Sequence, residues 1–333
     1  MDEPKSSDEP PSKRFGLPEV VSPYLKKLIS KTSGSQGPIG RQFLARSVEE
    51  NQHFKNGQRD PLIEEKFEVA PGLIYKYHGR ALWTITFLCA SYCRFCTRGR
   101  EVGNGKAFYL DDDIDQVLKF LGNHPEIKEV ILSGGDPLIS PQKYLTKIVN
   151  GLVKLQRKGQ IQVIRIGTRL PISNPVLIRP WHYKLVAKIK NPYLMVHINH
   201  PAELTPETLK VLNNFRQKAG ALVLSQTVFL KGVNDSVKTL TELFWKMTME
   251  GIRPYYLFQN DPVYWAKHFT VPIKRAIKIW QQLRPQLSGL AATARFVIDT
   301  PYGFGKIPIP EGAAWKVDYS SFLDFHRQKH QLA

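Results

Sequence analysis

The sequence is marked by one short stretch, Cys89-Ala90-Ser91-Tyr92-Cys93-Arg94-Phe95-Cys96, which contains all three cysteines of the 333-residue chain. It directly follows an apolar run, residues 82–88, that predicts a buried strand. Three thiolates on one loop can hold three irons of a 4Fe-4S cluster and leave the fourth iron open to a ligand. The alternatives are three unrelated thiols or a zinc site with a nearby histidine, but zinc sites usually use a second cysteine pair, which this sequence lacks. The pattern therefore predicts Cys89, Cys93 and Cys96 as iron–sulfur ligands.

Beyond this loop the chain alternates between apolar runs and segments that begin like helices. The further runs are residues 130–132, 163–166, 194–198, 222–229 and 255–258. Helix-start residues lie between them at Asp111, Pro141, Pro175, Pro206 and Ser236, and a sixth helical pattern covers residues 271–283. Strand then helix, six times over, predicts parallel βα units, either as a three-quarter barrel or as an open doubly wound sheet. In both arrangements the carboxyl ends of the strands carry the chemistry.

Composition and charge narrow the class of protein. Hydrophobic residues make up 42% of the chain, which is enough for a sizeable core and excludes wholesale disorder. No apolar run approaches the roughly 18 residues of a membrane helix, and the first residues lack the apolar stretch of a secretory signal. We therefore expect a soluble, cytoplasmic protein. The net charge of +18 is compatible with nucleic acid, an acidic protein partner or anionic cofactors, but the basic residues form no long block and suit a solvated surface.

The chain divides into four parts. Residues 1–14 are charged and rich in proline and serine, which predicts a disordered tail. Residues 15–80 predict an N-terminal extension with short helices. Residues 81–285 hold the six βα units, and residues 286–333 form a C-terminal segment.

A second loop of interest, Ser133-Gly134-Gly135-Asp136, ends the second predicted strand. Its glycines allow the backbone to approach a ligand closely, and its aspartate can receive an ammonium group. Taken alone, such a loop is a common turn.

The cysteine spacing C-x3-C-x-aromatic-C resembles the signature of the radical SAM superfamily. In that superfamily the open iron binds S-adenosyl-L-methionine (SAM), and the reduced cluster cleaves it to a 5′-deoxyadenosyl radical. The resemblance implies an α/β fold, a partial (β/α)6 TIM-like barrel of the radical SAM type, over residues 81–285. It also implies that Phe95 lies near the adenine and that the loop Ser133, Gly134, Gly135 and Asp136 meets the methionine amino group.

A longer series of motifs, in the same order, narrows the resemblance. They are residues 76–80, Thr97-Arg98, 166–169, 197–201, Gln226, 254–256, 268–269 and 299–306. The series is similar to the lysine 2,3-aminomutases, including the shorter bacterial enzymes that make β-lysine for the modification of elongation factor P, and it spans residues 65–310. The resemblance implies that Thr168, Arg169, His197 and Gln226 also bind cofactor.

The resemblance further implies a second cofactor, pyridoxal 5′-phosphate (PLP). Lys306, in the C-terminal segment, stands where the family carries the lysine that forms a Schiff base with PLP. Lys76 and Arg80, at the end of the N-terminal extension, stand where the family holds the PLP phosphate. Arg98 matches the residue that binds the carboxylate of the amino-acid substrate.

Two acidic residues, Asp261 and Asp299, match the family's positions around the ε-ammonium of lysine. A buried cation needs such paired carboxylates. Phe95 replaces a histidine of the archetypal enzymes, and Lys267 lies close to Asp261 in the sequence, so the exact amino acid stays open. No cysteine follows residue 96, so the zinc site of the longer family members is not expected.

These patterns predict an isomerase that converts L-lysine to β-lysine by a 5′-deoxyadenosyl radical mechanism, with an electron donor for the cluster. The alternatives are the same chemistry on another amino acid, a radical SAM enzyme acting on RNA, and a non-catalytic iron–sulfur protein. All three cysteines are assigned to one cluster, which argues against RNA-modifying types that need more thiols. The resemblance implies a homo-oligomer, and the basic surface suits an acidic protein partner in the elongation factor P pathway. Nucleic acid and membrane are not expected partners.

Overall fold

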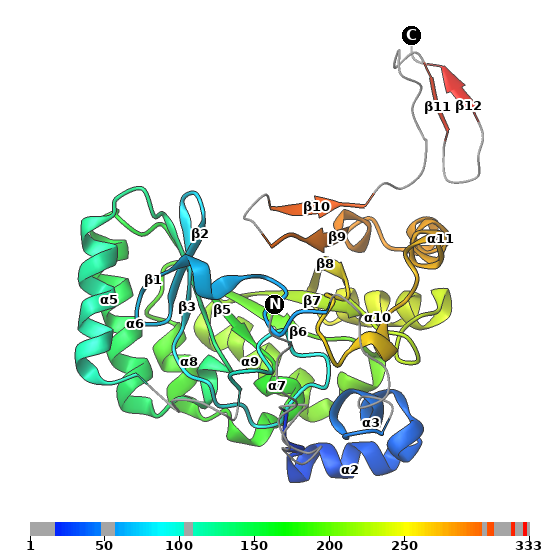
Figure 1. Cartoon of the computed structure of the whole chain (residues 1–333), viewed down its shortest axis with the longest axis horizontal. Coiled ribbons are helices and arrows are strands. Elements are labelled where there is room, and N and C mark those ends of the chain that lie inside the picture. The colour runs from blue at the N-terminus through cyan, green and yellow to red at the C-terminus, as the bar shows by residue number, and fades with distance from the viewer. Residues whose placement is uncertain are drawn as a thin grey trace, which may run out of the picture.

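The computed structural model describes residues 17–47, 57–102, 109–301 and 305–309, together with the backbone of two short strands at 321–323 and 329–331. A ten-stranded sheet runs in the order β1 to β10, and β11 and β12 form a separate antiparallel pair. The sheet has an edge strand at each end and does not close on itself (Figure 1). The predicted α/β fold with a partial barrel is therefore confirmed. The predicted disordered tail, residues 1–14, lies outside the described residues.

Parallel strands form the centre of the sheet. They are β3 (Arg80–Thr84), β4 (Glu129–Ser133), β5 (Val163–Thr168), β6 (Tyr193–His197), β7 (Leu222–Phe229), β8 (Arg253–Gln259) and β9 (Arg295–Asp299). The other strands pair antiparallel: β1 (Glu68–Ala70) with β2 (Leu73–Tyr77), β2 with β3, β10 (Lys306–Pro308) with β9, and β11 (Ser321–Leu323) with β12 (Lys329–Gln331). Antiparallel strands thus extend the parallel centre at both edges.

Three local predictions differ from the structure. The parallel strand β9 is an addition to the six that were predicted; it follows helix α11 (Ile273–Leu283) and two 3-10 turns. Its apolar residues 296–298 continue the strand–helix alternation, so the strand was missed although the sequence carries this signal. The N-terminal extension contains β1 and β2 besides helices. The first parallel strand ends at Thr84 instead of residue 88, because the carbonyls of Thr86 and Leu88 bond to the loop after β4 instead of to a strand.

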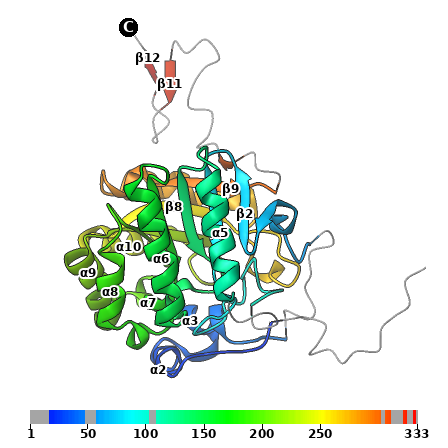
Figure 2. The same ribbon diagram turned by 90° about the vertical axis from the view of Figure 1, so that its left-hand side faces the viewer.

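Helices cover the outer face of the sheet (Figure 2). They are α5 (Asp111–Asn123), α6 (Gln142–Arg157), α7 (Leu170–Ser173), α8 (Pro180–Val186), α9 (Pro206–Ala219), α10 (Val237–Met249) and α11 (Ile273–Leu283). Thr205, just before the predicted start at Pro206, and the predicted cap Ser236 accept backbone N–H groups at the starts of α9 and α10. The start predicted at Asn174-Pro175 opens only a 3-10 turn, and α8 begins five residues later at Pro180.

Short 3-10 turns connect many of these elements. They are η1 (Gly34–Gln36), η2 (Glu64–Phe67), η3 (Pro137–Ile139), η4 (Pro175–Leu177), η5 (Pro201–Glu203), η6 (Lys267–Phe269), η7 (Arg284–Gln286) and η8 (Ala291–Thr293). Several of them follow a strand directly, where the chain turns over the carboxyl end of the sheet.

Alternate residues of the parallel strands face two different environments. Val130, Leu132, Ile164, Ile166, Leu194 and Val196 are buried in the main hydrophobic core with residues of the covering helices. Their neighbours Ile131, Ser133, Arg165, Gly167, Met195 and His197 line a cavity. Successive side chains of a strand point to opposite faces. The same strands therefore build the core on one face and the cavity wall on the other.

Two N-terminal helices, α2 (Pro23–Lys31) and α3 (Pro38–Phe43), lie together below the sheet in Figure 1. Ser22 caps α2 by accepting the N–H of Leu25, and Pro23 is its first residue. The buried side chains of the two helices pack against Cys93 and Ala202. Among the described helices, none has the length and apolar character needed to cross a bilayer.

Candidate active site

One cavity of about 560 Å³ lies at the carboxyl ends of the parallel strands, and every residue predicted to bind a metal, a cofactor or the substrate lines it. These residues are Lys76, Arg80, Cys89, Cys93, Phe95, Cys96, Arg98, Ser133, Gly134, Gly135, Asp136, Thr168, Arg169, His197, Gln226, Asp261, Asp299 and Lys306. The fold therefore brings together segments from the N-terminal extension, the barrel and the C-terminal segment.

The three cysteines are free thiols on one wall of the cavity. Burial raises the pKa of Cys89 and Cys96, and repulsion from neighbouring thiolates adds to this; for Cys96 the pKa rises to about 11. Within the described residues, no three His, Cys, Asp or Glu side chains converge on one metal ion. This arrangement fits a cluster, in which each thiolate binds a different iron, because the iron charge offsets the cost of ionising buried thiols.

The glycine loop packs directly against the segment that leads to the cysteines. Gly135 N donates to Thr86 O at 2.6 Å, and Asp136 N donates to Leu88 O at 2.7 Å. A Cβ atom at Gly134 would lie 2.1 Å from Thr86 O, and one at Gly135 would lie 2.2 Å from Leu88 O. Gly134 also has φ 129°, which favours glycine. The glycines are thus required for backbone-to-backbone packing as well as for space in the cavity.

Asp136 fastens this loop to the end of β5. Its carboxylate accepts the N–H of Leu138 at 3.1 Å, the hydroxyl of Thr168 at 2.8 Å and the N–H of Arg169 at 2.7 Å. Burial raises the pKa of Asp136 to about 6, and these hydrogen bonds oppose the rise. Both oxygens are used by the protein itself, so the carboxylate is built to hold two strand-end loops together.

The N-terminal helices hold the cysteine loop through a buried polar network that the sequence analysis missed. Gln42 on α3 accepts from Arg169 at 2.5 Å and donates to Glu203 at 2.7 Å. Its backbone carbonyl accepts the N–H of Arg94 at 2.9 Å. Arg169 also donates to Cys93 Sγ at 2.8 Å. The guanidinium of Arg169 therefore links the N-terminal helices to a cysteine of the cluster site.

Aromatic and imidazole rings form the wall beside the cysteines. Phe95 lies edge-on to His197, with ring centroids 5.5 Å apart, and edge-on to Phe269 at 5.7 Å. Burial, followed by the charge of Arg169, holds the pKa of His197 well below its ordinary value, so the ring is neutral. Gln226 lies next to His197 in the parallel register of β6 and β7.

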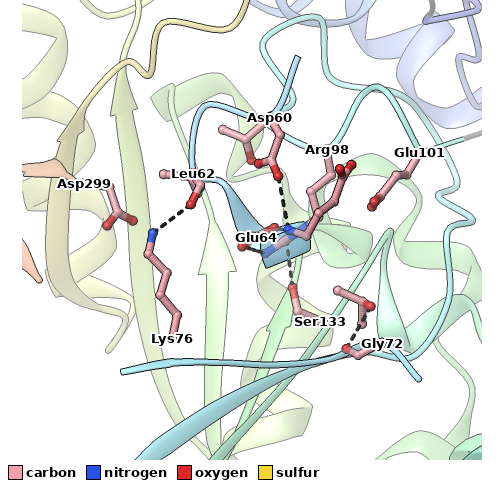
Figure 3. A network of polar contacts seen from close by, with 12 residues as sticks. Asp60, Leu62, Glu64, Gly72, Lys76, Arg98, Glu101, Ser133 and Asp299 are labelled. Atoms are coloured by element: carbon pink, nitrogen blue, oxygen red, sulfur yellow. Dashed lines mark hydrogen bonds and ion pairs between the residues drawn. The ribbon is translucent and has the colours of Figure 1, made fainter. Parts of the chain in front are cut away.

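Arg98 is paired with a carboxylate that the sequence analysis missed, Glu64 on η2. Its Nε and Nη2 atoms donate to the two oxygens of Glu64, each at 2.7 Å, and Nη1 donates to Ser133 Oγ at 3.3 Å. Figure 3 shows the guanidinium between these partners. Burial alone would raise the pKa of Glu64, but the charge and hydrogen bonds of Arg98 outweigh it and the pKa is lowered. The pair is ionised.

Lys306 and Asp299 form an ion pair across the antiparallel strands β9 and β10. The hydroxyl of Tyr77 donates to the other oxygen of Asp299 at 3.0 Å. The Lys306 ammonium lies 5.1 Å from the centre of the Phe258 ring. The predicted cofactor lysine and one of the predicted substrate carboxylates are therefore in direct contact.

The two cations predicted to hold a phosphate come from the strand hairpin β2–β3. Lys76 Nζ donates to the carbonyls of Leu62 at 2.9 Å and Thr300 at 2.7 Å. Burial lowers the pKa of Lys76, and the charges of Asp299 and Glu64 oppose this change. The guanidinium of Arg80 lies over the Tyr77 ring, 4.3 Å from its centre.

Asp261 differs from the other carboxylates of the cavity. No donor among the described residues reaches its carboxylate oxygens, and it is paired in no ion pair there. Burial, and then repulsion from Asp299, raise the pKa of Asp261 to about 7, while the charge of Lys306 opposes the rise. The two aspartates thus create a site that a cation would stabilise.

Comparison with known proteins identifies the family. A model of the radical SAM superfamily matches residues 83–244. L-lysine 2,3-aminomutase of Fusobacterium nucleatum is 36% identical over 290 residues, which cover 87% of this chain and 67% of that protein. L-lysine 2,3-aminomutase of Clostridium subterminale is 34% identical over 290 residues, with 87% and 68% covered. A putative L-lysine 2,3-aminomutase of Treponema pallidum is 32% identical over 293 residues, with 88% and 81% covered.

The chain belongs to the radical SAM lysine 2,3-aminomutase family. Its members are isomerases, and membership implies a 4Fe-4S cluster, SAM and PLP as cofactors. Among solved structures, SuiB of Streptococcus suis bound to SAM has a TM-score of 0.50 at 17% identity, covering 69% of this chain and 52% of that one. That likeness concerns the fold.

The side chains in the cavity of this aminomutase-family protein fit the three cofactors. Three free thiols share the wall next to Phe95 and His197. Lys306 supplies a primary amine, and Lys76 and Arg80 supply cations suited to a phosphate. The residues that sequence reasoning missed, above all Gln42 and Glu64, contact the assigned residues instead of forming motifs of their own.

Proposed function

We propose that the protein is a PLP-dependent aminomutase that moves the amino group of L-lysine from C2 to C3 and a hydrogen atom from C3 to C2, giving β-lysine. When bound, the cluster and SAM supply the radical that abstracts the C3 hydrogen, and PLP carries the migrating nitrogen. The observation that carries this proposal is the distribution of charge in one cavity, which provides Arg98 for a carboxylate and two aspartates for a cation.

The separation of these groups suits an amino acid with a cationic side chain. Figure 3 shows Arg98 and Asp299 on opposite sides of Lys76, so a carboxylate and an ammonium at the two ends of one substrate can both find partners. The raised pKa of Asp261 supports a cationic ligand, because a buried pair of carboxylates is relieved by a positive charge. The relatives named L-lysine 2,3-aminomutase support the same substrate.

Lys306 and Asp299 define the amine end of the cavity. Asp299 holds the Lys306 ammonium in this structure. If PLP were held on that amine, Asp299 would be available to a substrate ammonium. Tyr77 donates to the other oxygen of Asp299 and so maintains the orientation of this carboxylate.

The proposal is tested with the full-length protein, purified without oxygen and supplied with iron, sulfide and PLP. It is incubated with dithionite, SAM and a mixture of the twenty amino acids, and mass spectrometry measures the β-isomers. We expect β-lysine, its loss in Asp299→Asn, and no change in Asp115→Asn, whose carboxylate is exposed on α5.

Other products of this assay would contradict the proposal in different ways. A different β-amino acid would retain the chemistry and reassign the pocket. Formation of 5′-deoxyadenosine without any β-isomer would show SAM cleavage for another reaction, including a reaction on RNA. The electron donor, the acidic protein partner in the elongation factor P pathway and self-association stay predictions from the sequence.

A further inference from the structure

We infer that Glu64 is a positioning residue, which fixes the Arg98 guanidinium so that its unused N–H groups meet the substrate carboxylate. The inference rests on the proposed function and names the residue that shapes its carboxylate site. The observation behind it is that only some of the N–H groups of Arg98 have an acceptor among the described residues.

A guanidinium has five N–H groups in one plane, and Glu64 uses only one edge of it. The Nε–Nη2 edge is closed by the two Glu64 oxygens, and Ser133 accepts one N–H of Nη1. One N–H on each terminal nitrogen therefore remains without an acceptor among the described residues. These groups can bind a second carboxylate without displacing the first.

Glu64 is bound too firmly to Arg98 for a substrate carboxylate to displace it. Its side chain is 9% exposed and that of Arg98 is 15% exposed, so the pair is buried. Breaking a buried ion pair by removing one partner is strongly unfavourable, because the other charge is left uncompensated. A substrate carboxylate that displaced Glu64 would leave that carboxylate buried and unpaired. The substrate therefore adds to the pair.

The backbone around Glu64 is built to present it. Ile63, immediately before it, has φ 53°, a left-handed conformation that is unfavourable for a β-branched residue. The residues just before it are tied down at two points, by Asp60 to Arg100 at 3.1 Å and by the Leu62 carbonyl to Lys76. Figure 3 shows Leu62 beside Lys76, and Asp60 and Glu64 near Arg98. The strained backbone conformation of Ile63 therefore occurs at the point where the chain directs the Glu64 side chain toward Arg98.

The test compares two ligands that differ only in the carboxylate. Binding of L-lysine and of cadaverine, which is lysine without its carboxylate, is measured by calorimetry on the full-length protein loaded with its cofactors. In Glu64→Gln we expect the Kd of L-lysine to rise about ten- to hundredfold, as for a lost charge-assisted hydrogen bond. We expect the Kd of cadaverine to stay within about twofold, because its binding does not use Arg98.

Two further variants separate positioning from a general effect on folding. Glu64→Asp keeps the charge that balances Arg98 but withdraws the carboxylate by one methylene, so it should fold and still weaken L-lysine binding. Glu65→Gln alters an adjacent side chain that is 66% exposed and pairs with Arg100. It should change the Kd of neither L-lysine nor cadaverine. In an Arg98→Lys background, Glu64→Gln should add little, because both changes remove the same fork.

Each contrary result has a separate meaning. Unchanged L-lysine affinity in Glu64→Asp, or an equal loss of cadaverine binding, would overturn the inference. If Glu64→Gln and Arg98→Lys together changed the Kd of L-lysine by the full product of their separate effects, the inference would be overturned as well. If the wild-type protein converts another amino acid, the proposed substrate is wrong, and the same variants are measured with that amino acid and its decarboxylated amine. If it binds no amino acid, both the proposed function and this inference are wrong.

Discussion

The two ends of the cavity differ in how their charged and polar groups are bonded. The cluster end comprises the cysteine loop, the loop of residues 133–136 and the end of β5. The amino-acid end comprises Lys76, Asp261, Asp299 and Lys306. At the cluster end, polar side chains are hydrogen-bonded by other loops of the protein. At the amino-acid end, the carboxylate of Asp261 faces the cavity without a donor among the described residues, beside the Lys306–Asp299 ion pair.

Two aspartates that line the cavity illustrate the difference. Asp136 accepts hydrogen bonds from Leu138, Thr168 and Arg169, and its pKa is raised by burial to about 6. The carboxylate of Asp261 accepts no hydrogen bond from the described residues, and burial with repulsion from Asp299 raises its pKa to about 7. A satisfied carboxylate organises the fold, while an unsatisfied one is available to a ligand.

This comparison teaches that position at a strand end does not define a role. Both ends lie at the carboxyl ends of parallel strands, as expected for such folds. The cluster end needs rigid geometry, because three thiolates must meet one preformed cluster. The amino-acid end must exchange one cation for another, and there the Asp261 carboxylate has no donor among the described residues while Asp299 holds Lys306.

The largest effect is expected from Gly135→Ala, which should break the cluster end. A Cβ atom there would lie 2.2 Å from Leu88 O, so the glycine loop or the segment before the cysteines must move. We expect loss of iron and sulfide, measured by chemical analysis and by the absorbance of the cluster, and loss of turnover. Gly122→Ala on α5, where a Cβ meets no atom within 4 Å, is the control. Normal iron content in Gly135→Ala would contradict the rigid packing of this end.

The second effect is confined to the amino-acid end and should separate the two regions. In Lys306→Ala the cavity loses the amine that we assign to PLP, so bound PLP and β-isomer formation should both be lost. The iron content should be unchanged, because Lys306 contacts Asp299 and no residue of the cysteine loop. Lys278→Ala, on the exposed face of α11, is the matched control. Loss of iron in Lys306→Ala would show that the two ends are coupled.

The smallest effect concerns the pH dependence of stability at Asp261. The folded carboxyl keeps its proton up to about pH 7, whereas the unfolded carboxyl loses it near its ordinary pKa. The folded state therefore binds more protons in this window, and the free energy of unfolding falls as pH rises through it. Asp261→Asn lacks this contribution and should gain stability over the wild type between about pH 4 and about pH 7.

This gain is measured from urea unfolding of both proteins at several pH values. Asp115→Asn, an exposed change on α5, provides the control. A difference between Asp261→Asn and the wild type that does not vary with pH would show that Asp261 has the same pKa in the folded and unfolded protein. The contrast with Asp136 would then be lost.

Sequence reasoning reached most of the fold and the composition of the cavity wall, and the site residues that it missed share one cause. The six predicted strands follow from apolar periodicity, and the helix starts from capping residues such as Thr205 and Ser236. The strand β9 was missed although its residues 296–298 form an apolar run after a predicted helix. Glu64 and Gln42 lie in segments without a motif, and their importance comes only from Arg98 and Arg169, which are distant in the sequence.

The sequence by itself determined the chemistry that the chain can hold. Three closely spaced cysteines, a glycine loop and a lysine near the C-terminus are local features, and their spacing can be read without coordinates. Only the tertiary structure decided which of these charged and polar groups are already bonded to the protein and which remain available. Hydrogen bonds and ion pairs such as Glu64–Arg98 and Lys306–Asp299 depend on distances between strand ends, and those distances are set by how the sheet curls and not by separation along the chain.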